Sequence, residues 1–146
     1  MARQLFIMLT AVLMLCSILL ADDTRKKVND FTLEDYNGAK HSLTDYKSSK
    51  AIVLMFTATQ CPVSNGYNGR MVELYKDYSS KDVTFIGINS NKQENAEEVR
   101  NHSKEHGFEF PVLKDWNNVI ADKLEASVTP EIYVLNSKLE VLYHGR

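Results

Sequence analysis

The residues best suited to carry out a chemical reaction lie in a short stretch around Cys61, which is followed by Pro62 and Ser64. A strongly apolar run over residues 51–56 precedes them, and six apolar residues bounded by polar ones predict a buried strand. Proline is favoured at the first position of a helix, so Pro62 predicts that a helix begins there. We therefore expect Cys61 at a helix N-terminus, where unpaired N–H groups and partial positive charge stabilise a thiolate.

Such a placement would make the Cys61 thiol a nucleophile. A free thiol with a pKa near 8.5 is only about 3% thiolate at pH 7, whereas a pKa of about 7 makes it about half thiolate. Ser64 lies one helical turn further on, and its hydroxyl could hydrogen-bond the thiolate. The alternatives are that Cys61 is a small buried hydrophobic residue and that Ser64 is an ordinary helix-start residue.

Other chemistry is weakly indicated. His102 and His106 are four residues apart, as metal ligands on one helix face can be. Their neighbours are polar, so we interpret them as a solvated helix face and expect no metal and no cofactor. The chain has a net charge of −2 and no long basic run, which argues against a nucleic-acid partner.

The length of 146 residues fits one domain, preceded by an apolar N-terminal segment. Residues 1–21 contain Arg3, an apolar core and Ala21 before a polar switch, which is the pattern of a secretory signal peptide. Residues 22–27 are charged, and we expect a flexible leader there. We predict an exported protein, periplasmic or extracellular. Bulky Leu19 is a poor fit to a cleavage site, so an uncleaved membrane anchor stays open.

The two cysteines then have different fates. Cys16 lies inside the expected signal peptide, so the mature chain would carry Cys61 alone and no internal disulfide. A lone thiol in an oxidising compartment is either buried and inert or reactive.

The remaining periodicities predict the element order β-β-β-α-β-α-β-α-β-β, an α/β domain with a mixed central sheet flanked by helices. An N-terminal hairpin turned at Asn37-Gly38 extends the sheet. The expected elements are hairpin strands at 30–33 and 40–43, a strand at 51–56, an amphipathic helix from Pro62 to Tyr78 with one face inward, a strand at 82–88, a helix from a capping box at Asn95 and Glu98 to Gly107, an extended segment at 110–113, a helix marked by Trp116 to Leu124 with Asp115 as its cap, and a hairpin over 131–135 and 139–143.

The predicted domain covers residues 28–146 and ends on its last strand. A sheet in such a domain normally has both faces covered, yet no closing helix remains. We therefore expect that the final helix is missing and that the sequence is truncated at its C-terminus. A resolving cysteine beyond Arg146 stays an open alternative.

Three motifs together resemble the thioredoxin-like superfamily, in particular its extracytoplasmic redoxin branch of TlpA-like and AhpC/TSA-like domains. They read Phe-Thr-Ala-Thr-Gln-Cys-Pro-Val-Ser, Phe-Pro-Val-Leu-Lys-Asp and Val-Thr-Pro-Glu-Ile-Tyr-Val-Leu, and the resemblance covers about residues 27–146. It implies that Cys61 is the first, nucleophilic cysteine of a Cys-x-x-Cys motif. It also implies that Thr129 and Pro130 form the cis-proline loop that receives the substrate backbone, although most Xaa–Pro bonds are trans.

The departures from that pattern limit the expected mechanism. Ser64 replaces the second cysteine, so an external thiol would have to resolve a mixed disulfide. Gln60 stands where thioredoxins usually have tryptophan, and Met55 replaces their buried acid. Peroxiredoxins resemble the chain less, because Leu54 and Ala58 stand in place of their proline and their threonine or serine.

The resemblance implies an exported thiol-disulfide oxidoreductase that acts through Cys61. Its partners would be protein or small-molecule thiols and disulfides, together with an external reductant. One alternative is a non-catalytic module that binds a partner through the surface around Cys61 and Pro130. A less favoured alternative is a one-cysteine peroxidase, in which the thiol is oxidised to a sulfenic acid and reduced by a partner.

Overall fold

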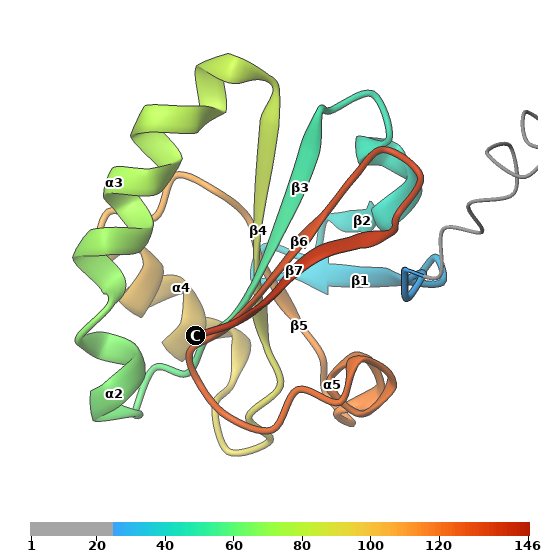
Figure 1. Ribbon diagram of the computed structural model, residues 1–146. Helices are drawn as coiled ribbons and strands as arrows, with labels where there is room; N and C mark the ends of the chain where they lie inside the picture. The colour runs from blue at the N-terminus through green and yellow to red at the C-terminus, as the bar shows by residue number, and fades with distance from the viewer. Residues whose placement is uncertain (1–24) are drawn as a thin grey trace, which may run out of the picture.

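A seven-stranded sheet with the order β2-β1-β5-β4-β3-β6-β7 forms the centre of the molecule in the computed structural model, which describes residues 25–146 (Figure 1). The signal peptide expected over residues 1–21 lies outside the described residues. The strands are β1 (Thr32–Asp35), β2 (Lys40–Ser42), β3 (Ala51–Phe56), β4 (Val83–Asn89), β5 (Val112–Lys114), β6 (Glu131–Leu135) and β7 (Val141–Gly145).

The sheet is mixed, as the sequence predicts. Strand β3 pairs in parallel with β4 and antiparallel with β6, and Leu54 stands opposite Ile86 on one side and Tyr133 on the other. Strand β4 is also parallel to β5, while the N-terminal hairpin joins the sheet through the antiparallel β1–β5 pair. Strand β3 therefore lies inside the sheet, and its carboxyl end leads directly to Cys61.

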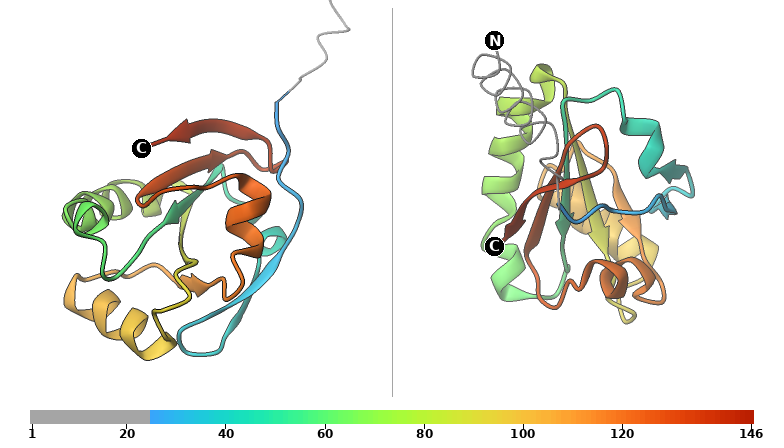
Figure 2. Two further views of the ribbon diagram at one scale, coloured as in Figure 1. Left: turned by 90° about the horizontal axis from the view of Figure 1, so that it is seen from below. Right: turned by 45° about the vertical axis from the view of Figure 1, so that its right-hand side comes forward.

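Helices cover both faces of the sheet. They are α2 (Pro62–Asn65), α3 (Asn68–Tyr78), α4 (Ala96–Glu105) and α5 (Val119–Leu124), with short 3-10 turns η2 (Leu43–Tyr46) and η3 (Ser79–Lys81). The view from below shows α3 and α4 on one side of the sheet and α5 on the other (Figure 2). Within residues 25–146, no helix has the length and apolar character needed to cross a membrane.

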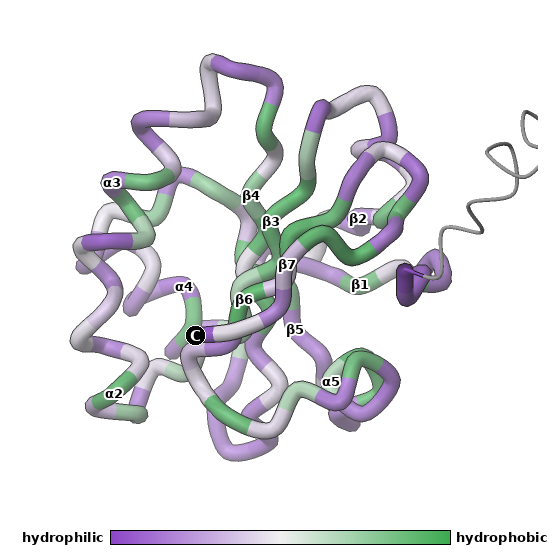
Figure 3. The backbone as a smooth tube through the Cα atoms, in the orientation of Figure 1, coloured by the Kyte–Doolittle hydropathy of each residue, from purple (hydrophilic) through white to green (hydrophobic). Residues whose placement is uncertain are grey.

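Alternating side chains of the central strands build two separate cores. Ile52, Leu54 and Phe56 face α5 and η2, where they pack with Leu43 and Leu124. The residues between them face α3 and α4, where the buried cluster comprises Met55, Met71, Phe85, Val99, Phe108, Phe110 and Val112. This alternation follows from the period of two in a strand. The hydropathy tube shows green segments concentrated on the strands (Figure 3).

The helix expected from Pro62 to Tyr78 is instead two helices, and most of its apolar side chains are exposed. The Tyr67 N–H bonds to the Ser64 carbonyl three residues back at 3.0 Å, which tightens the turn and separates α2 from α3. Only Met71 of the predicted inward face is buried, while Val63 is 58% and Leu74 is 39% exposed. The prediction of one helix with an inward apolar face was wrong.

Two predicted helix starts have clear side-chain caps. Asn95 accepts a hydrogen bond from the Glu98 N–H, and the Glu98 carboxylate accepts one from the Asn95 N–H, so the capping box is confirmed. The Asp115 carboxylate accepts from the N–H groups of Ile120 and Ala121 and so caps α5 from outside it. Trp116 lies before this helix and is 49% exposed, so it is not the helix residue we expected.

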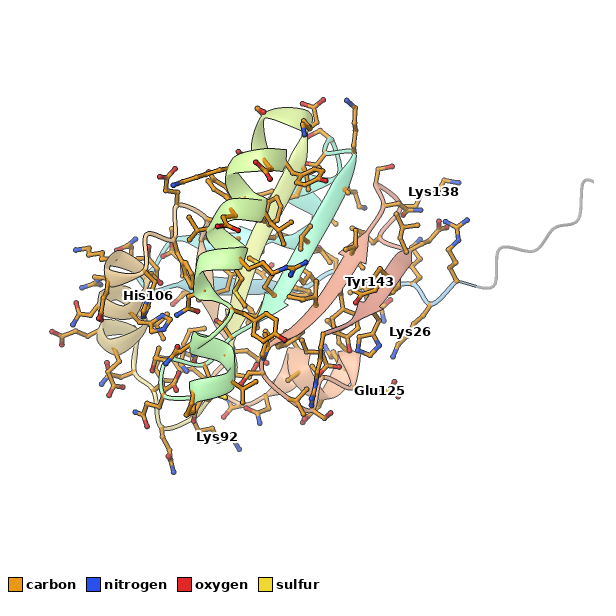
Figure 4. The ribbon with its side chains drawn as sticks, turned by 60° about the vertical axis from the view of Figure 1, so that its left-hand side comes forward. Lys26, Lys92, His106, Glu125, Lys138 and Tyr143 are labelled. Atoms are coloured by element: carbon orange, nitrogen blue, oxygen red, sulfur yellow. The ribbon has the colours of Figure 1, made fainter. Side chains whose placement is uncertain are left out.

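Two residues at the end of the expected leader over residues 22–27 contact the domain. Lys27 forms a β-bridge with Glu140, and the Lys26 carbonyl accepts a hydrogen bond from the Val141 N–H at 2.9 Å. Lys26 also forms a 2.8 Å ion pair with Glu125, and both side chains lie on the same side of the molecule in Figure 4. The backbone of Lys26 and Lys27 thus pairs with the segment that enters β7, while residues 22–24 lie outside the described residues.

Candidate active site

Cys61 occupies the position that its sequence context predicts, at the start of the helix that follows β3. It is the N-cap residue of α2, with an extended backbone (φ −82°, ψ 115°), and Pro62 opens the helix. The sulfur accepts a hydrogen bond from the Ser64 N–H at 3.5 Å. The side chain is half-buried and the thiol is free. An unpaired N–H group of the first helical turn therefore points at the sulfur.

The loop before β6 brings a second expected segment against Cys61. The Thr129–Pro130 peptide bond is cis. This confirms what the family resemblance implied, although most Xaa–Pro bonds are trans. The Cys61 thiol donates a hydrogen bond to the Thr129 carbonyl, with 3.7 Å between sulfur and oxygen. Pro130, the next residue in the chain, is buried. The structure thus places Cys61, Pro62, Ser64, Thr129 and Pro130 in one site.

The surroundings of the sulfur lower the pKa of the Cys61 thiol, as predicted. A hydrogen bond with the Thr129 side chain contributes most, followed by the hydrogen bond from the Ser64 N–H. Burial and the negative charge of Glu94 act in the opposite direction, while the Val63 N–H adds to the lowering. The net effect favours the thiolate, which is the nucleophilic form of cysteine.

Ser64 acts through a different atom than the sequence suggested. Its side chain is fully buried, and its hydroxyl oxygen accepts a hydrogen bond from the Ala58 N–H at 3.2 Å. The hydrogen bond to the Cys61 sulfur comes from the Ser64 backbone N–H instead. The expected hydroxyl–thiolate contact is therefore corrected: the hydroxyl braces the loop that precedes Cys61.

A buried carboxylate holds that preceding loop in place. Glu94, which has no exposed surface, accepts hydrogen bonds from the backbone N–H groups of Thr59 at 2.9 Å and Gln60 at 3.0 Å. The side-chain amides of Asn89 and Asn91 donate to the same carboxylate at 2.5 and 2.9 Å. Burial raises the pKa of Glu94, but these hydrogen bonds outweigh it and hold the pKa below the ordinary value.

A buried lysine stands on the other side of this network. The Lys114 ammonium donates to the Asn89 side-chain oxygen at 2.5 Å and to the Asn91 carbonyl at 2.6 Å. Burial lowers the pKa of Lys114, while the charge of Glu94 partly opposes that shift. The two opposite charges are thus linked through Asn89, which satisfies the rule that buried charges are paired and hydrogen-bonded.

A second buried carboxylate holds the loop on the opposite side of Cys61. Glu131 follows Pro130 directly, and one of its oxygens accepts from the N–H groups of Ser127 at 2.8 Å and Val128 at 3.2 Å. Its other oxygen contacts the His144 imidazole at 2.5 Å. Burial raises the pKa of Glu131, yet the hydrogen bonds from His144 and the loop leave it below the ordinary value.

His102 also reaches toward the site, which corrects its interpretation as part of a solvated helix face. Its Nε2 atom lies 2.8 Å from the Asn65 side-chain oxygen, and the Asn65 amide donates to the Thr59 carbonyl at 2.9 Å. Burial lowers the pKa of His102, and the positive charge of His106 lowers it further. Among residues 25–146, no group of three or more His, Cys, Asp or Glu side chains could hold a metal ion.

A cavity of about 320 Å³ opens beside the sulfur. It lies between the loop before α2, the end of β4 and the loop before β6, which meet at the lower end of the sheet in Figure 1. Its lining includes Cys61, Thr57, Ser90, Val128 and Thr129. A disulfide-bearing group placed there would contact both the sulfur and the main chain of the cis-proline loop.

Neither of the two carboxylates, Glu94 and Glu131, was predicted from the sequence. Glu131 carried a signal that could have been used, because it directly follows Pro130 in an otherwise apolar strand. Glu94 carried none, since it lies in a polar loop and bonds to residues 34 and 35 positions earlier.

Comparison with known proteins identifies the family. The sequence model of the AhpC/TSA family matches residues 24–144. The thiol-disulfide oxidoreductase ResA of Bacillus subtilis is 30% identical over 113 residues, which are 77% of this chain and 62% of ResA. The chain therefore spans less than two thirds of that relative.

Solved structures agree on the fold. The crystal structure of an uncharacterized conserved protein from Geobacillus kaustophilus has a TM-score of 0.80 at 31% identity, covering 84% of this chain and 68% of that one. A putative thiol:disulfide interchange protein DsbE from Chlorobium tepidum has a TM-score of 0.74 at 20% identity, covering 84% of each chain. The chain belongs to the AhpC/TSA family and has a thioredoxin-like fold.

Proposed function

We propose that this chain is an exported thiol-disulfide oxidoreductase in which Cys61 is the single nucleophile. The observation that supports the proposal most is the position of the sulfur, which accepts the Ser64 N–H and faces the Thr129 main chain. The relationship to ResA, named a thiol-disulfide oxidoreductase, supports the same activity. Export rests on the apolar segment that follows Arg3 in the sequence.

The reaction follows from having one cysteine. The Cys61 thiolate attacks one sulfur of a substrate disulfide, the S–S bond breaks, and the departing thiolate takes a proton from solvent. A mixed disulfide remains on Cys61. Ser64 has no sulfur with which to resolve it, so an external thiolate attacks the Cys61 sulfur and releases the reduced substrate. A second external thiol then frees Cys61 and leaves as the oxidised disulfide of the reductant.

The substrates in this proposal are protein or small-molecule disulfides. Thr129 and Pro130 would hold the substrate main chain beside Cys61, within the cavity of about 320 Å³. Pro62 would start the helix whose first N–H groups stabilise the thiolate. No cofactor takes part in this exchange, because thiolates supply and receive the electrons.

A partner-binding module without catalysis is the second candidate, and one observation favours it. A groove of about 340 Å³ beside Pro130 is lined by the exposed side chains of Tyr67, Leu74 and Tyr143. Figure 4 shows Tyr143 on the side of the sheet where α3 lies. Such a surface could bind a protein without any exchange at Cys61.

The variant Cys61→Ser separates the two candidates. We expect the wild-type chain to reduce a peptide disulfide when glutathione is supplied, and the variant to lose this turnover above the uncatalysed background. The variant should still bind the oxidised peptide, as measured by calorimetry. Wild-type turnover at the background rate, combined with intact binding, would favour the binding module and reject the oxidoreductase.

A further inference from the structure

The two loops that bracket Cys61 are held in the same way from opposite sides. Glu94 accepts the N–H groups of Thr59 and Gln60, the two residues immediately before Cys61. Glu131 accepts the N–H groups of Ser127 and Val128, the two residues immediately before Thr129. In each case one buried carboxylate takes two consecutive main-chain donors, and the next residue contacts the reacting sulfur or carries it.

From this arrangement we propose that Glu94 and Glu131 are positioning residues, which together fix the span between the Cys61 sulfur and the Thr129 main chain. The inference deepens the proposed oxidoreductase function and rests on it for the turnover readout. Neither carboxylate contacts the sulfur, so neither is a catalytic residue. Their role is to keep the thiolate and the substrate-binding main chain at one separation while disulfides exchange.

The chemistry of the two sites explains why carboxylates are used. The main-chain N–H groups of Thr59 and Gln60 are donors, and so are the side-chain amides of Asn89 and Asn91, so only a group with two acceptor oxygens satisfies all four. The negative charge on Glu94 is balanced by Lys114, which is linked to it through Asn89. A buried polar network that is fully satisfied in this way is rigid.

The two positions differ in how they should tolerate glutamine. In Glu94→Gln, either orientation of the new amide points its NH₂ group at a main-chain N–H and an asparagine NH₂, so two donors lose their acceptor. In Glu131→Gln, the amide oxygen can still accept Ser127 and Val128 while the NH₂ group faces His144, whose ring nitrogen can accept. Glu131→Gln is therefore a matched control that keeps the loop anchored, whereas Glu131→Ala removes the anchor.

The first test is the alkylation rate of Cys61 with iodoacetamide at pH 7, which needs no substrate disulfide. Releasing either loop weakens the contacts that lower the pKa of the thiol, which come from the Thr129 side chain and from the Ser64 N–H. We expect Glu131→Ala to react about threefold more slowly than wild type, the change that a half-unit rise in pKa produces. Glu94→Gln should also react more slowly but by a smaller factor, because removing the negative charge of Glu94, which raises the Cys61 pKa, opposes part of the loss. Glu131→Gln should stay close to the wild-type rate. In concentrated urea all four proteins should react equally.

The second test is the split between kcat and KM for a peptide disulfide with glutathione. Displacing Thr129 weakens docking, so Glu131→Ala should raise KM while Glu131→Gln leaves it unchanged. Circular dichroism and thermal unfolding establish that each variant is folded, and Glu94→Asp replaces Glu94→Gln if the latter unfolds. Folded Glu94 and Glu131→Ala variants with wild-type alkylation rates would overturn the inference. A wild type without turnover but with the expected alkylation pattern would instead reject only the oxidoreductase function.

Discussion

At the Cys61 sulfur, the hydrogen bonds change with the protonation state. The thiol can donate to the Thr129 carbonyl, but a thiolate has no proton to give, so this bond exists only in the neutral form. The Ser64 N–H, by contrast, donates to the sulfur and favours the anion. Ionisation therefore frees the Thr129 carbonyl, which then becomes available to a substrate N–H at the place where a mixed disulfide would form.

The variant Ser64→Ala tests which Ser64 atom matters. The hydroxyl accepts from the buried Ala58 N–H, so its removal leaves that donor unsatisfied. We expect a loss of about 1 kcal/mol in the free energy of unfolding, measured by urea denaturation. The pH midpoint of Cys61 alkylation should not move, because the backbone N–H of residue 64 remains. A raised midpoint with unchanged stability would show that the hydroxyl acts on the sulfur after all.

At the scale of elements, α4 reaches the site through one side chain. His102 contacts Asn65 of α2, and Asn65 in turn holds the Thr59 carbonyl. The ring also packs against His106 and Phe108, with centroids 4.4 and 5.7 Å away. A charged imidazole would be poorly solvated in this position, so the folded state favours the neutral ring.

This placement predicts a pH dependence of stability. The pKa of His102 in the folded state lies below its ordinary value of 6.5, so the unfolded chain binds the proton first as the pH falls. Stability from this group is complete above about pH 6.5 and is lost as the pH falls toward the folded pKa, with a slope of at most about 1.4 kcal/mol per pH unit. Urea unfolding between pH 7.5 and 5 measures it.

The matched variant is His102→Gln, which keeps an amide near Asn65 but does not titrate. We expect its unfolding free energy to fall less steeply than that of wild type over the same pH range. His106→Gln removes the neighbouring charge and should reduce the wild-type slope without abolishing it. Equal slopes in wild type and His102→Gln would contradict a neutral, buried His102.

At the scale of the whole molecule, several carboxylates tie distant segments together in their ionised form. The pKa values of Glu94 and Glu131 lie below the ordinary 4.5, and those of Asp30 and Asp35 lie below 3.8, where hydrogen bonds outweigh burial. The unfolded chain therefore takes up protons at higher pH than the folded protein. Their stabilisation is present above about pH 4.5 and is lost as the pH falls through the folded values.

We accordingly expect the protein to unfold cooperatively below about pH 4.5, which circular dichroism would measure. Glu131→Gln should make this transition shallower, because one of the linked carboxylates no longer titrates while its loop contacts persist. Glu34→Gln is a useful comparison, since Glu34 lies on the N-terminal hairpin away from Cys61 and makes no ion pair among those identified in residues 25–146. A Glu131→Gln transition identical to that of wild type would contradict the linkage.

The parts of the fold that the sequence predicted are those set by neighbouring residues. The strand at 51–56, the cap at Asn95 and the position of Cys61 before Pro62 depend on hydrophobic runs and local capping. The break after Asn65 was not predicted because the helical spacing of apolar residues continues across it. A single hydrogen bond over three residues, from the Tyr67 N–H to the Ser64 carbonyl, separates the two helices. The cis bond at Pro130 came from the family resemblance, since local preference favours trans.

The supporting residues of the site could not be predicted because their partners are distant in the sequence. Glu94 bonds to Thr59 and Gln60 only once β4 lies beside β3, and His102 meets Asn65 only when α4 packs next to α2. A polar loop and an amphipathic helix give no local sign of such contacts. Reactive residues are visible in the sequence by type and spacing, whereas the residues that position them depend on the folded sheet.

The most direct test of the proposed nucleophile is the rate at which the wild-type chain reacts with a chromogenic aromatic disulfide as the pH is varied. We predict the release of one aromatic thiol per chain and a mass increase located on Cys61. We further predict a rate midpoint below that of free cysteine measured in the same buffers, because the hydrogen bonds at the sulfur lower its pKa. A rate midpoint at or above that of free cysteine would contradict the proposal that Cys61 is an activated nucleophile.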